Sequence, residues 1–196
     1  EIMPSLVGSE MCIRDSRIGV NYEPPEKTNF PIGSGKMPVY ATVGSAIMDL
    51  MGKENQIPNH VPLAHKPIVA ARYGYVKEGC KLNVDDLPPE LAVATRRDSK
   101  TGKVSNYSHV YKRLDRNKPS TTMVPGHNAF PIHPILNRTL TAREAARIQT
   151  FPDTHIFFGT RQEQCIQVGN AVPPKMAEPF LKKIREYIEN SEEVTP

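Results

Sequence analysis

Residues Arg138 to Asp153 read RTLTAREAARIQTFPD, and this stretch decides the structure predicted for the C-terminal part of the chain. Thr141 and Glu144 have the T-x-x-E spacing of a capping box, in which each side chain accepts a hydrogen bond from the other residue's N–H. The pattern predicts a helix over residues 142–149, which Phe151-Pro152 ends because the residue before a proline is disfavoured in the α region. We expect the inward face to hold Ala145 and Ile148, and another face to hold Arg143 and Arg147.

Residues Glu163 to Pro174 read EQCIQVGNAVPP and form a second distinctive segment. Residues 166–168 alternate between apolar and polar, which predicts a short strand, and Gly169-Asn170 permits a tight turn or the close approach of another group. Pro173 or Pro174 has the fixed φ angle that suits the start of a helix. That last helix carries an apolar stripe, which we expect to pack on a sheet that this chain does not itself supply. The stripe consists of Met176, Phe180, Leu181, Ile184 and Ile188.

These two segments resemble the ninth and tenth motifs of the DNA (cytosine-5) methyltransferases, in the family's own order. Weaker similarities extend the resemblance over residues 17–190. They are Thr42-Val43, Ala46-Ile47, Asp49-Leu50, Asn59-His60, Ser120-Thr121-Thr122 and His133-Pro134. The resemblance implies an α/β fold of the Rossmann-like, S-adenosylmethionine-dependent methyltransferase type. This chain would supply only its C-terminal portion, with a small, mixed α+β, loop-rich target-recognition lobe.

The resemblance also implies a division of the chain. Residues 17–50 would end the catalytic core, residues 51–135 would form the target-recognition region, and residues 136–196 would hold the last two motifs and the closing helix. Enzymes of this family flip the target cytosine out of the duplex, because its reactive atoms are shielded in the base stack. A cysteine thiolate from a Pro-Cys pair then attacks C6, a glutamate assists at N3, and C5 receives the methyl group.

Positive charge is concentrated in residues 96–118, which contain eight basic and two acidic residues. Such a run is compatible with a merely solvated face. Lys and Arg also neutralise phosphates and release counterions, which supplies much of the non-specific affinity for nucleic acids. Since the segment falls in the implied recognition region, we expect it to contact double-stranded DNA. The expected DNA-binding residues are Arg96, Arg97, Lys100, Lys103, Lys112 and Arg113.

Residues 6–16, LVGSEMCIRDS, resemble the translation of a transposase adapter used to prepare sequencing libraries. A signal peptide is the natural alternative, but the segment lacks a basic region followed by a long apolar one. We therefore expect residues 1–16 to be an artefact that is not part of the folded protein. The remaining residues hold 24 basic and 18 acidic side chains, a net charge of +6. A junction here leads us to expect that the natural protein continues upstream and that this chain is a C-terminal fragment.

The composition excludes several classes of protein. Hydrophobic residues make up 38% and charged residues 23% of the 196 positions, which is typical of a globular protein rather than a disordered tail. No apolar run approaches the roughly 18–20 residues of a membrane span. The 19 prolines indicate a loop-rich chain. Three scattered cysteines suit a reducing compartment, and we expect a cytoplasmic monomer.

Few site residues follow from the resemblance. Asn170, Ala171 and Val172 match the turn that lines the S-adenosylmethionine pocket, although Gly169-Asn170 could equally do no more than shape a turn. Arg143 and Glu144 match the ninth motif, whose role is architectural, with the arginine reaching a phosphate or a backbone carbonyl.

The catalytic residues of the family have no counterpart in this sequence. The Gly-rich cofactor loop, the Pro-Cys nucleophile and the Glu-Asn-Val motif are all absent. Cys80 follows a glycine and Cys165 a glutamine, so we expect each to be a buried or incidental thiol. The histidines lack the spacing of a metal site, and no metal is expected. These histidines are His60, His65, His127 and His133.

The leading hypothesis is therefore the C-terminal part of a DNA cytosine-C5 methyltransferase from a restriction-modification system or a phage, inactive by itself. One alternative is a non-enzymatic DNA-binding module, for which a start codon directly before Arg17 would be diagnostic. The other is an RNA-directed methyltransferase, because that branch of the family shares both motifs.

Overall fold

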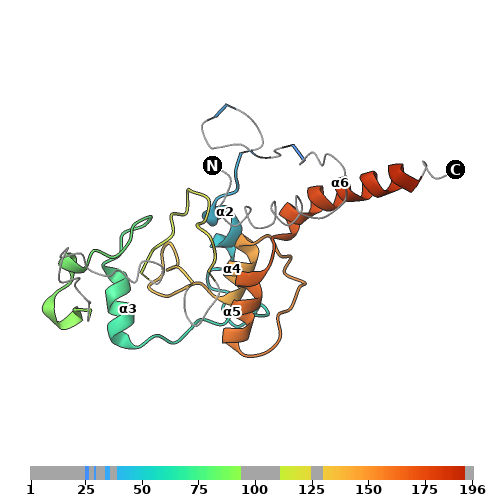
Figure 1. The fold of residues 1–196 in the computed structure, drawn as a ribbon. Helices are drawn as coiled ribbons and strands as arrows, with labels where there is room; N and C mark the ends of the chain where they lie inside the picture. The colour runs from blue at the N-terminus through green and yellow to red at the C-terminus, as the bar shows by residue number, and fades with distance from the viewer. Residues whose placement is uncertain are drawn as a thin grey trace, which may run out of the picture. The chain divides into compact units, whose positions relative to one another are not determined.

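The computed structural model describes residues 25–26, 29, 34–35, 39–93, 111–124 and 130–192. The chain divides into two compact units, one formed by residues 41–171 and the other by residues 1–40 with 172–196. The adapter-like stretch lies outside the described residues. Figure 1 shows the elements, which in chain order are α2 (Val43–Ile47), η1 (Met48–Leu50), α3 (Pro67–Gly74), η2 (Val84–Asp86), η3 (Pro89–Leu91), α4 (Ala142–Ile148), α5 (Arg161–Asn170) and α6 (Pro174–Glu192).

Helix α4 packs against α2 and α5, and the three contribute to the larger apolar core of the first unit; Figure 1 shows them stacked one above another. Parts of the chain far apart in sequence meet in this core, so the predicted recognition region and the ninth-motif helix share it. Its buried members are Val43, Ile47, Leu50, Leu114, Met123, Phe130, Leu140, Ala142, Ala145, Ala146, Phe157, Cys165 and Val168.

Helix α4 confirms the predicted capping box. Thr141 and Glu144 each accept a hydrogen bond from the other's backbone N–H, at 3.1 and 2.8 Å. The way the helix ends differs from the prediction. Thr150 has a φ of +65°, and the N–H groups of Thr150 and Phe151 return to the carbonyls of Arg147 and Ala146. This is a Schellman-type end, so the helix already ends before the restriction imposed by Pro152 on Phe151.

The strand predicted over residues 166–168 is wrong, because these residues lie inside helix α5. A second capping box starts this helix: Thr160 accepts from the Glu163 N–H, and the Glu163 carboxylate accepts from the Thr160 N–H at 2.7 Å. Cys165 and Val168 are three residues apart and both point into the core. The apolar alternation that suggested a strand is therefore the edge of a helical stripe.

Helix α3 belongs to a second, smaller core. Tyr73 and Val76 pack there with Leu82 and Ile132. Backbone pairing around this core consists of isolated bridges, Lys81 with Lys112, Arg113 with Ile132 and Ile132 with Thr139. The part of the chain that the structure describes contains no longer strand ladder, so the sheet of the expected α/β fold is not found among these residues.

Helix α6 belongs to the other unit and begins at Pro174, one of the two prolines predicted to start it. Its predicted apolar stripe is only partly covered. Met176, Phe180 and Ile184 are half-buried, whereas Leu181 and Ile188 remain 62% and 47% exposed.

Candidate functional site

Arg113, expected to contact DNA, is instead only 4% exposed. Its guanidinium donates to five oxygens at 2.6–2.9 Å, and burial lowers its pKa. The prediction that Arg113 contacts DNA is therefore wrong, because these acceptors take up its donors inside the unit. The acceptors are the carbonyl oxygens of Tyr73, Val76, His133 and Leu136 and the side-chain oxygen of Asn137.

Lys112, the neighbour of Arg113, is half-buried and lies in the bridge with the exposed Lys81. The two side chains lie on the face of the pair opposite to the buried Arg113 and Leu82. Lys112 is therefore on the other side of the pair from the buried Arg113, and its expected contact with DNA stays a prediction. The other predicted DNA-binding residues, Arg96, Arg97, Lys100 and Lys103, lie outside the described residues.

Arg143, expected on a different face of its helix from Ala145 and Ile148, is fully buried. It donates to the carbonyl oxygens of Pro58, Pro152 and His155 at 2.9, 3.1 and 2.5 Å. Burial lowers its pKa. Of the two expected partners, a phosphate or a backbone carbonyl, the structure places carbonyls around it. Arg143 thus ties α4 to the segment that contains Pro58 and to the loop that follows the helix.

Glu144 is the other buried charge on α4. Its carboxylate accepts from both Nη atoms of Arg138, at 2.7 and 2.8 Å, and from the Thr141 N–H. Burial alone would raise the pKa of Glu144, but the Arg138 guanidinium outweighs it and the pKa is lowered. The ion pair is therefore charged at neutral pH, and it fixes the start of α4 to the preceding loop.

Asn59 and His60, which the sequence marks only as a weak family feature, both bind the α4 region. The Asn59 carbonyl accepts from the Arg143 N–H at 3.0 Å, and its side-chain oxygen accepts from Nη2 of Arg143 at 3.3 Å. The Asn59 side chain donates to the carbonyl of Phe157 and accepts from its N–H, at 2.7 and 2.9 Å. His60 is fully buried between the Thr141 hydroxyl and the carbonyl of Leu50. We call the set of Asn59, His60, Arg138, Thr141, Arg143 and Glu144 the buried polar cluster. The residue type at position 59 was the only local signal in the sequence, since asparagine favours the left-handed region and Asn59 has a φ of +63°.

The three expected cofactor residues lie at the end of α5, where Gly169 and Asn170 are still helical and Ala171 is the C-cap. Asn170 ends the helix and is exposed, and the Ala171 N–H caps it by donating to the carbonyl of Val168 at 3.3 Å. Val172 is half-exposed. Among the described residues, no side-chain partner holds the Asn170 amide.

The remaining candidate groups give no reactive centre. Cys165 is buried, which raises the pKa of its thiol, and Cys80 is exposed. Within the described ranges, no group of three or more His, Cys, Asp or Glu side chains could hold a metal ion. The helices seen there also include none that is both long and apolar enough to cross a membrane.

Comparison with known proteins gives a family match over most of the chain. The profile of the C-5 cytosine-specific DNA methylases matches residues 20–186, starting downstream of the adapter-like stretch. The chain is also 36% identical over 140 residues to the type II methyltransferase M.DdeI of Desulfomicrobium norvegicum. It is 31% identical over 168 residues to M.NgoFVII of Neisseria gonorrhoeae.

The share of each relative that is matched differs. The match covers 67% of this chain and 33% of M.DdeI, and 85% of this chain and 41% of M.NgoFVII. M.AquIB of a Picosynechococcus strain is 36% identical over 148 residues, which make up 69% of this chain and 93% of that relative. The chain thus spans a third to two fifths of the first two proteins but nearly all of the third.

Proposed function

The chain belongs to the C-5 cytosine-specific DNA methylase family, and from this premise we propose that it is the C-terminal part of an enzyme that methylates C5 of cytosine in a specific DNA sequence. The methyl donor would be S-adenosylmethionine, and the enzyme would serve a restriction-modification system or a phage. The observation that carries the proposal is the match over residues 20–186. The type II methyltransferases among the relatives support the restriction-modification setting.

The buried polar cluster supports an architectural role for the ninth motif. Arg143 is bound to backbone carbonyls and Glu144 to Arg138, so neither charge is available to a substrate. We infer that they hold α4 rigidly under the recognition region, which then presents a fixed surface to DNA.

The turn formed by Asn170, Ala171 and Val172 would line one side of the cofactor pocket. S-adenosylmethionine, when bound, supplies an electrophilic methyl group on a sulfonium. The exposed Asn170 amide can bind a polar group of such a ligand, and the half-exposed Val172 offers an apolar contact. Residues upstream of this chain would complete the pocket.

The basic segment would attach the enzyme to the DNA backbone. Replacing Arg96, Arg97, Lys100 and Lys103 by Ala in the full-length enzyme should weaken DNA binding. The slope of log affinity against log salt should flatten by up to about 0.9 for each phosphate that is no longer neutralised. Titration of a labelled duplex at several salt concentrations measures this slope. An unchanged slope would remove these residues from the interface.

Methyl transfer tests the proposed reaction directly. The full-length protein should transfer tritium-labelled methyl groups from S-adenosylmethionine to unmethylated duplex DNA, with 5-methylcytosine as the product after digestion. The present chain alone should give none, because Cys165 is buried and neither it nor Cys80 has the Pro-Cys context. Methylated adenine, or methylation of RNA in place of DNA, would contradict the proposal. Robust transfer by this chain alone would contradict its inactivity.

A second candidate has one observation in its favour. M.AquIB is itself short, because the 148 matched residues make up 93% of it. That relative is itself named a type II methyltransferase, so its length favours a separate chain of this extent, and a DNA-binding module without the reaction stays the alternative. Such a module would bind duplex DNA in the titration above and gain no methyl transfer when upstream sequence is supplied.

A further inference from the structure

Two lysines face each other across the bridge between residues 81 and 112. The Leu82 N–H donates to the carbonyl of Tyr111 at 2.8 Å, and the Arg113 N–H donates to the carbonyl of Cys80 at 3.0 Å. These bonds flank the pair, so Lys81 and Lys112 occupy a non-hydrogen-bonded antiparallel position, where facing side chains lie closest. We call them the lysine pair.

Like charges placed directly opposite each other destabilise a strand pair. Alternation places Leu82 and Arg113 on the buried face, which leaves the lysine pair on the solvent side. Among the described residues, no carboxylate forms an ion pair with either lysine. The two positive charges of the lysine pair therefore do not stabilise the free chain.

The nearest acidic residues in the sequence are engaged elsewhere. Glu78 binds Arg116 through both carboxylate oxygens at 2.8 Å, and these bonds lower the pKa of Glu78 to about 2. Asp115 accepts from the Asn117 N–H at 2.9 Å and pairs with Lys118 at 3.1 Å, and both contacts lower its pKa. Glu78 and Asp115 are thus each bound to another cation, and neither carboxylate compensates the charge of the lysine pair.

We propose that Lys81 and Lys112 together form a contact for the sugar-phosphate backbone of duplex DNA, with Lys81 as a DNA-binding residue outside the basic segment. A phosphodiester between the two ammonium groups attracts both of them. It also offsets the repulsion between the two lysines in the free chain, so both effects favour binding. Lys112 also belongs to the basic segment, residues 96–118, so the lysine pair joins Lys81 to that segment. The inference rests on the proposed function, because it assigns part of that enzyme's DNA surface.

Lys81→Glu in the full-length protein tests the contact, because stability and binding should change in opposite directions. The new carboxylate faces Lys112 as an attractive pair, so the urea midpoint of the free protein should stay the same or rise. Binding to a fluorescein-labelled duplex of mixed sequence should weaken, and the slope of log affinity against log salt should fall by about 0.9 to 1.8.

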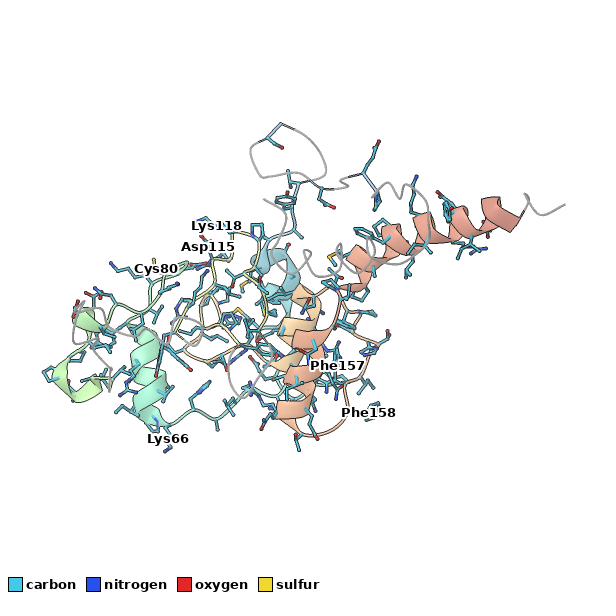
Figure 2. The ribbon with its side chains drawn as sticks, in the orientation of Figure 1. Lys66, Cys80, Asp115, Lys118, Phe157 and Phe158 are labelled. Atoms are coloured by element: carbon cyan, nitrogen blue, oxygen red, sulfur yellow. The ribbon has the colours of Figure 1, made fainter. Side chains whose placement is uncertain are left out.

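Lys66→Glu is the matched control. Lys66 is also exposed, has the same charge change, and lies at the opposite end of α3 from Cys80, the neighbour of Lys81, as Figure 2 shows. It should leave the salt slope at the wild-type value. An equal slope for Lys81→Glu and Lys66→Glu would overturn the contact while wild-type methylation of DNA still upheld the proposed function. A wild-type protein that binds RNA duplex and not DNA would overturn both.

Discussion

The burial of two arginines could not be predicted from the sequence of this chain. Arg113 and Arg143 occur in basic or helical contexts that are typical of exposed side chains, yet both are buried and bind backbone carbonyls. The carbonyls around Arg143 come from Pro58, which is 85 residues away in the sequence, and from Pro152 and His155 in the loop after its helix. No local pattern reports such acceptors, because they come together only when the chain has folded.

His133 gives the residue-scale prediction, a loss of stability in mild acid. Its Nδ1 accepts from the N–H groups of Ile135 and Leu136, both at 3.1 Å, and its buried Nε2 has no hydrogen-bond partner among the described residues. Burial lowers the pKa of His133 to about 4, although the Glu144 carboxylate acts in the opposite direction. The folded state therefore keeps a neutral ring at pH values where the unfolded chain already binds a proton.

Between the unfolded pKa of 6.5 and the folded pKa of about 4, stability falls as the pH falls. The contribution of His133 should be a loss of about 2 kcal/mol between pH 7 and pH 5. His133→Asn keeps an acceptor for both N–H groups and cannot titrate. Urea unfolding at both pH values should show a smaller loss for this variant than for the wild-type chain. An identical loss in both would mean that His133 takes no part in the acid sensitivity.

Helices α4 and α5 show which sequence signal predicts a helix in this chain. Both begin with a T-x-x-E capping box, at Thr141 and at Thr160. The box at Thr141 predicts its helix to within one residue. At α5 the strand prediction relied instead on a three-residue apolar alternation, which is too short to distinguish a strand from the edge of a helix. The start signal is the more reliable one, because it concerns specific backbone donors.

Thr160→Ala should destabilise the chain by about 1 kcal/mol, because the Glu163 N–H at the start of α5 loses its acceptor. Thr160→Ser is the matched control, since it keeps the hydroxyl and should lie close to the wild-type value. The urea midpoint measures both variants, and the urea dependence of the unfolding free energy should not change. If Ala and Ser at position 160 gave the same midpoint, the capping bond would not contribute to stability.

At the scale of the whole molecule, the sequence predicted the family and the starts of α4 and α6 better than it predicted the interior. The two motifs and the start of α6 at Pro174 follow from local residues. The shared core of Leu114, Phe130 and Ala145 could not be predicted, because it joins segments assigned to different regions. The division into a core end, a recognition region and a closing segment stays a prediction.

The apolar stripe of α6 provides the prediction for the whole molecule. Leu181 and Ile188 are 62% and 47% exposed, which leaves an apolar face on a helix that also carries surface ion pairs such as Lys182 with Glu178. Contiguous apolar surface of this kind favours association. We therefore expect the present chain to self-associate, and the full-length enzyme to cover the stripe.

The double variant Leu181→Gln/Ile188→Gln should distinguish an exposed stripe in the present chain from a covered stripe in the full-length enzyme. In the present chain the double variant should change stability by no more than about 0.5 kcal/mol, as for surface positions, and should shift sedimentation velocity profiles toward monomer. In the full-length enzyme the same change should cost about 2–4 kcal/mol, because two apolar side chains leave a buried interface. Lys183→Gln, also exposed on α6, should have neither effect. A core-like loss of stability in the present chain would mean that the stripe is already buried without any upstream sequence.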